Sequence, residues 1–156
     1  MNTKIVFVDI IMFMVILIPI TLLVIYTIGG DKKVKRNIIK LCKKNGINLN
    51  HFEINGDLIL GIDAANKKLV CSERKNVETN FQVIDLNSLD DCKVKVLKLS
   101  KRTTDWVGLE LVSSNVKKEI PFYIENDDDS PATDPKIREQ QAIKWAKMIK
   151  PHLKVS

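Results

Sequence analysis

The side chains that could carry out chemistry are few and scattered along this chain of 156 residues. Its two histidines, His51 and His152, lie far apart in the sequence, and neither belongs to a recognisable arrangement of nucleophile and base. The sequence contains no G-x-S-x-G nucleophile turn and no glycine-rich phosphate-binding loop. We therefore predict no catalytic residue, no cofactor and a protein that is not an enzyme.

Two groups of residues invite a metal-site hypothesis. The three cysteines, Cys42, Cys71 and Cys92, are widely spaced and odd in number, which favours reduced, packed thiols over a zinc site. The acidic stretch 125–135 contains three aspartates in a row, but it lacks the alternating acids, the glycine and the final glutamate of a calcium-binding loop. We therefore predict no metal site, and we interpret the acidic stretch as a solvated loop.

The longest apolar segment lies at the start of the chain, over residues 5–28. Residues 10–28 contain no charged side chain, and a helix of that length approaches the roughly 30 Å thickness of a hydrocarbon core. The run is longer than the apolar region of a cleaved signal peptide. We therefore predict a single-pass membrane protein in which residues 1–30 form an uncleaved transmembrane anchor, ended by Gly29 and Gly30.

The net charge of +6 is concentrated directly after this apolar run. Residues 31–46 hold seven basic side chains and one acidic side chain, whereas residues 47–156 hold equal numbers of both signs. Because basic residues flank membrane spans on the cytoplasmic side, we expect the N-terminus outside and the C-terminal domain in the cytoplasm. The balanced charge of the domain gives no reason to expect nucleic acid as a partner.

Residues 31–46 also have the periodicity of a basic amphipathic helix, which Asn45 and Gly46 would end. Either this helix lies in the membrane interface and contacts anionic lipid head groups, or its narrow apolar stripe packs on the following domain. The stripe consists of Val34, Ile38, Leu41 and Cys42. The candidate lipid contacts are Lys32, Lys33, Lys35, Arg36, Lys40, Lys43 and Lys44.

From residue 47 onward, short apolar runs replace the helical pattern. Six strands are expected in succession with no helix between them. They cover residues 57–63, 68–73, 80–86, 93–99, 106–112 and 118–124. The first two would form a hairpin around Asn66. Consecutive short strands favour an antiparallel meander that closes as a sandwich or barrel.

The last predicted element is a helix over residues 135–150, which begins at Pro135 and ends before Pro151. Thr133 or Asp134 would cap its N-terminus. One face of this helix is apolar, and we expect its bulky side chains to cap one end of the strand assembly. These capping residues are Ile137, Trp145 and Ile149.

This order of short antiparallel strands and one C-terminal amphipathic helix with a central Trp145 resembles the pleckstrin-homology (PH) superfold. The stretch 120–124 adds to the similarity, which covers residues 50–153 and is greater for bacterial membrane-anchored members than for eukaryotic signalling ones. The resemblance implies an antiparallel β-barrel capped by the helix. Members that bind phosphoinositides carry further basic residues on the strand after the first hairpin, whereas Lys67 and Lys68 are followed here by apolar residues. The phosphoinositide function therefore does not carry over.

The sequence thus predicts an α+β protein in three parts: a transmembrane anchor (1–30), a basic juxtamembrane helix (31–46) and a PH-like β domain (47–156). We expect a membrane-tethered, non-enzymatic binding module that presents this domain at the cytoplasmic face to a protein partner or to anionic lipid. The alternative is a structural or scaffolding subunit of a larger membrane complex, held there by its span.

Overall fold

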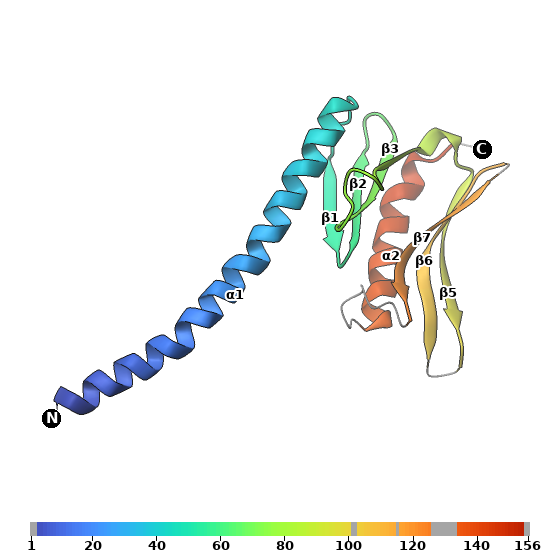
Figure 1. Ribbon diagram of the computed structural model, residues 1–156. Helices are drawn as coiled ribbons and strands as arrows, with labels where there is room; N and C mark the ends of the chain where they lie inside the picture. Colours follow the sequence, from blue (N-terminus) through green and yellow to red (C-terminus); the bar gives the residue numbers. More distant parts are fainter. Residues whose placement is uncertain (1–2, 101–102, 115, 126–133, 155–156) are drawn as a thin grey trace. The chain divides into compact units, whose positions relative to one another are not determined.

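The computed structural model describes residues 3–100, 103–114, 116–125 and 134–154, with side chains for all of these except residues 3–11 and 22–29. Among the described residues, a long helix is followed by seven strands and a second helix. Figure 1 shows the ribbon from the N-terminal helix to the C-terminal one. The chain divides into two units, Met1–Asn37 and Ile38–Ser156. All of the strands in the described part of the chain lie in the second unit.

The helix α1 (Thr3–Lys44) continues from the apolar run into the basic segment without a break. Gly29 and Gly30 do not end it, contrary to the prediction, because a helix-interior glycine costs only about 1 kcal/mol relative to alanine and keeps its backbone donor. The predicted end of the basic helix is confirmed. Gly46 adopts a φ of +67°, and the Asn45 side chain donates a hydrogen bond of 2.8 Å back to a carbonyl of the helix.

The predicted transmembrane anchor is not supported. Among the helices whose side chains are described, none combines the length and the apolar character that crossing a membrane requires. This finding contradicts three predictions: the anchor over residues 1–30, the single-pass membrane protein, and the N-terminus outside with a cytoplasmic domain.

The first four strands form an antiparallel meander in the order β1-β2-β3-β4. Their bounds are β1 (His51–Asn55), β2 (Leu58–Asp63), β3 (Lys68–Glu73) and β4 (Gln82–Asp85). β1 was not among the predicted strands. Its five residues, HFEIN, do alternate between polar and apolar side chains, but so short a run is a weak signal for a strand.

The last three strands form a second antiparallel meander in the order β5-β6-β7. Their bounds are β5 (Asp91–Lys98), β6 (Thr104–Val112) and β7 (Lys117–Ile124). A short 3-10 turn, η1 (Leu86–Ser88), carries the chain from the first sheet to the second. The helix α2 (Pro135–Ile149) and the 3-10 turn η2 (Lys150–His152) follow, and α2 packs on β5, β6 and β7 (Figure 1).

The predicted closed β-barrel is wrong. Among the described strands, none of the first sheet pairs with a strand of the second. The strands at the sheet edges explain why the ladder does not close. β4 has only four residues, and β7 contains Pro121, which has no N–H to donate, next to a bulge that leaves Phe122 without a partner on β6. The fold is α+β, with two antiparallel sheets and a C-terminal helix.

The buried core lies between the sheets and α2, and three predicted capping residues fall on this helix. Trp145 and Ile149 are fully buried, whereas Ile137 is 50% exposed, so its predicted place in the core is wrong. At about 100° per residue, Ile137 lies about 80° around the helix from Trp145. Arg138 occupies the buried position instead, and its guanidinium donates to Gln141 at 3.1 Å.

Candidate functional site

A pocket of about 410 Å³ lies between the two sheets of the second unit. One of its walls is β7, from which the consecutive residues 118–124 line the pocket. The opposite wall comes from the turn between β1 and β2, the end of β3 and the start of β4. It consists of Asn55, Asp57, Leu58, Cys71, Ser72, Glu73, Asn80 and Gln82.

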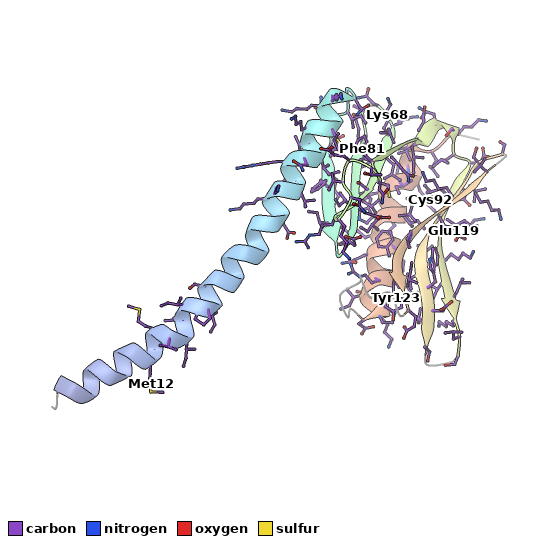
Figure 2. All side chains as sticks on the ribbon, in the orientation of Figure 1. Met12, Lys68, Phe81, Cys92, Glu119 and Tyr123 are labelled. Atoms are coloured by element: carbon purple, nitrogen blue, oxygen red, sulfur yellow. The ribbon has the colours of Figure 1, made fainter. Side chains whose placement is uncertain are left out.

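The run of β7 residues fixes the direction in which the pocket extends. Successive residues of a strand point to opposite faces of a sheet, so a pocket under one face would be lined by every second residue. An unbroken run means that the pocket extends along the backbone edge of the strand. β7 pairs only with β6, so its second edge is open among the described strands. Figure 2 shows the side chains of Glu119 and Tyr123 along this strand.

The backbone of Glu119 points to the open edge. At the β6–β7 hairpin, Ser113 N donates to Val116 O at 3.0 Å, and hydrogen-bonded pairs alternate along an antiparallel ladder. Counting from this pair, every second residue of β7 is hydrogen-bonded to β6, so the N–H and C=O of Ile120 point toward β6. The position of its carbonyl oxygen agrees, because that oxygen lies 2.4 Å from where a Cβ on Gly108 of β6 would be. The N–H and C=O of Glu119 therefore face away from β6.

In the wall opposite β7, the end of β3 extends past the residues that pair with β4. β3 pairs with β4 only from Lys68 to Cys71, so Ser72 and Glu73 extend beyond the start of β4. Ser72 Oγ donates to the Val77 carbonyl at 2.8 Å, and Asn80 Nδ2 donates to Glu73 Oε2 at 2.6 Å. These bonds attach the loop after β3 to the end of that strand. The loop and the strand therefore form this wall of the pocket together.

A hydrogen bond joins the two walls, because Lys118 Nζ of β7 donates to Gln82 Oε1 of β4. The pocket also contains a donor without a partner. Asn55 Nδ2 is buried, and it makes no hydrogen bond with any described residue. Buried donors are nearly always satisfied, so this nitrogen favours a ligand that brings an acceptor oxygen to the pocket.

Acidic side chains dominate the charges that line the pocket, which are Asp57, Glu73, Glu119 and Lys118. Glu119 forms an ion pair with Lys95 at 2.6 Å. Asp57 and Glu73 form no ion pair with another described residue, although each carboxylate accepts a hydrogen bond from a neutral donor. The end of the pocket next to the β1–β2 turn therefore carries negative charge.

A second polar cluster lies where α2 meets β1. Glu53 accepts hydrogen bonds from Trp145 Nε1 at 3.0 Å, from His51 Nε2 at 2.9 Å and from Lys144 Nζ. Partial burial alone would raise the pKa of Glu53, but the bonds from Lys144, His51 and Trp145 outweigh burial and lower the pKa to about 2. The carboxylate accepts all three hydrogen bonds, so the cluster attaches α2 to β1.

The cysteines and the acidic residues offer no reactive group or metal centre in the part of the chain that the structure describes. Burial raises the pKa of each of the three thiols, Cys42, Cys71 and Cys92, to about 11, and in Cys42 the charge of Asp63 adds to the effect. The described residues hold no group of three metal-ligating side chains. The acidic residues 126–133 lie outside the described part of the chain.

The seven cations that we predicted as lipid contacts are exposed on α1. Lys32, Lys33, Lys35 and Arg36 belong to the first unit, whereas Lys40, Lys43 and Lys44 belong to the second. In the second unit, Ile38 and Cys42 of the apolar stripe are buried. Their burial favours the interpretation in which the stripe packs on the following domain, and contact of the cations with anionic lipid stays a prediction.

Sequence reasoning missed the pocket. The pocket draws on residues from 55 to 124, and no local pattern brings these together. One local signal was available, because a proline inside an apolar strand, such as Pro121, favours an edge strand. Comparisons of the chain with protein-family models, with curated proteins and with solved structures found no match. The resemblance to the PH superfold is therefore neither confirmed nor refuted, and function has to be argued from the pocket.

Proposed function

We propose that the second unit is a non-enzymatic protein-interaction module that binds an extended segment of a partner protein along β7. The observation that carries this proposal is the unbroken run of β7 residues, 118–124, along one wall of the pocket. An extended segment in that position would add a fourth strand to the three-stranded sheet. Its backbone would bond to the outward N–H and C=O of Glu119.

Side chains of the pocket would supply the rest of the affinity. Each backbone hydrogen bond contributes only about 0.5–1.5 kcal/mol net, so a short segment needs further contacts. Leu58 and Tyr123 are half-buried in the pocket wall, and Ile124 is 41% exposed. Apolar side chains of the segment would cover these surfaces, at about 25 cal/mol for each Å² removed from water.

The same strand carries features that oppose unspecific pairing. Pro121 provides no N–H at the open edge, and the bulge at Phe122 interrupts the ladder. A second copy of the chain would therefore find a poor template for a long ladder. A short segment that uses the part of β7 before Pro121 avoids both features, which supports a peptide ligand.

The described polar groups of the pocket support binding over catalysis. The hydroxyl of Ser72 is buried and donates to the carbonyl of Val77. The thiol of Cys71 has a pKa raised by burial to about 11, so it is protonated at neutral pH. The alternative function of a scaffolding subunit depended on a membrane span, and no described contact favours it.

The test is to select decapeptides on the full chain from a random display library and to follow amide hydrogen exchange by NMR when a selected peptide is added. We expect exchange of the Glu119 amide to slow, because that N–H faces the open edge and gains a partner. The matched control is the neighbouring Lys118 amide, which already faces β6 in the ladder and should change little. Selection of no peptide, or of peptides that leave the Glu119 amide unprotected, would refute the proposal.

A further inference from the structure

The charged end of the pocket is built by the register of one hairpin. In the β2–β3 pairing, Leu58 stands opposite Glu73, and Arg74 N donates to the Asp57 carbonyl at 2.7 Å. Asp57 and Glu73 therefore lie at the same end of the two strands, and both line the pocket. Two carboxylates that line one end of a pocket, neither in a described ion pair, favour a cation there.

The other charges around this end have fixed partners or lie elsewhere. Lys118 Nζ donates a hydrogen bond to Gln82 on the opposite wall of the pocket, and Glu119 forms an ion pair with Lys95. Arg74 and Lys75 follow Glu73 in the sequence and contact Asp57 through their backbone N–H groups, and neither residue lines the pocket. The lining therefore presents two carboxylates with no described ion pair, opposite one lysine that is already hydrogen-bonded.

The neighbouring amide adds a second requirement on the ligand. Asn55 pairs with Leu58 across the β1–β2 turn, so its buried, unpartnered Nδ2 belongs to the same end of the pocket. A donor in this position calls for an acceptor such as a peptide carbonyl. A positive side chain next to a backbone carbonyl is what a lysine or arginine residue of an extended chain provides.

We propose that the partner segment carries a lysine or arginine whose charged group binds between Asp57 and Glu73, while its backbone lies along β7. This inference rests on the proposed binding of an extended segment to β7. The positive charge complements the two carboxylates, and it selects basic segments among all those that could form the backbone bonds.

The test compares two double variants of the full chain with equal net charge. Asp57→Asn with Glu73→Gln removes both carboxylates but keeps the oxygens that accept from Lys75 N and from Asn80. The matched control, Glu78→Gln with Glu139→Gln, removes two acidic charges from outside the pocket lining. The probe is a decapeptide selected from a random library on the unmodified chain, with a second version in which its basic residue is replaced by glutamine.

We expect selected peptides to be enriched in lysine or arginine. We also expect the pocket variant to bind the probe roughly five- to tenfold more weakly than the control variant does, with a weaker dependence on salt. The glutamine version should bind both variants equally. Equal affinities of the two variants for the basic probe, with the Glu119 amide still protected, would overturn this inference alone. Loss of that protection would overturn the proposed function as well.

Discussion

Glu53 is the residue at which the attachment of α2 can be tested by pH. Its pKa is lowered from 4.5 to about 2 in the folded chain, so the unfolded state binds a proton first as the pH falls. The stabilisation is therefore fully present above about pH 4.5 and is lost as the pH falls toward 2. We expect Glu53→Gln to lower the free energy of unfolding at pH 7 by about 2 kcal/mol, and by much less at pH 2.5.

Urea denaturation of the wild-type chain and of Glu53→Gln, between pH 7 and pH 2.5, checks this prediction. The control is Glu78→Gln, which removes an exposed carboxylate for which the structure shows no bond to a described residue. A difference between the wild-type chain and Glu53→Gln that stays constant down to pH 2.5 would contradict the assignment of the stabilisation to the ionised carboxylate.

The space around Gly108 and Gly46 predicts different costs of replacing each glycine with alanine. A Cβ on Gly108 would lie 2.4 Å from the Ile120 carbonyl oxygen and 2.4 Å from the Trp106 ring, and the backbone oxygen cannot move without disturbing the β6–β7 ladder. We expect Gly108→Ala to destabilise the chain by about 1–3 kcal/mol or more. At Gly46 a Cβ meets nothing within 4 Å, so Gly46→Ala should cost only about 1 kcal/mol, for its φ of +67°. Equal losses in urea denaturation would contradict this account.

At the scale of elements, the N-terminus of α2 depends on one side chain. Asp134 Oδ1 accepts a hydrogen bond from Lys136 N at 2.8 Å, and Pro135 occupies the first turn. We expect Asp134→Ala to lower the free energy of unfolding by about 1 kcal/mol, whereas Asp134→Asn, which keeps the accepting oxygen, should lose only a few tenths. Thermal unfolding of the three chains measures both losses. If Asp134→Asn lowered the free energy of unfolding as much as Asp134→Ala does, the loss would not come from the capping hydrogen bond.

The elements show which parts of the fold a sequence can predict. α2, with Asp134 as its cap, followed from local signals, since an N-cap, a proline and an apolar stripe are all read within one helix. The buried strands were also predicted from local signals, because each is a short apolar run bounded by turn residues. β1 was missed because it has only five residues, and the side chains that hold it, such as Trp145 bonded to Glu53, lie 92 residues away. The pocket was missed because it depends on which sheet edges stay open, and edge pairing is a long-range property.

At the scale of the whole molecule, the charge count and the fold divide the chain at different places. The sequence placed the domain from residue 47, after the basic segment. The structure places the start of the second unit at Ile38, inside α1. Ile38, Cys42 and Ile47 are all buried, so the last turns of α1 belong to the domain by packing, even though their charges resemble those of the segment before them.

This division makes a prediction about fragments. We expect residues 38–156 to unfold cooperatively in urea with nearly the free energy of the full chain, because Ile38 and Cys42 keep their packing. A fragment of residues 47–156 loses both side chains, and we expect it to be less stable by about 2–4 kcal/mol, at roughly 1.5–3 kcal/mol for a fully buried large apolar side chain. Because each fragment retains the pocket and β7, each should bind a selected decapeptide as the full chain does, under conditions in which it is folded. Equal stability of the two fragments would show that the end of α1 adds nothing to the domain. Failure of residues 38–156 to fold would show instead that the domain needs the first unit.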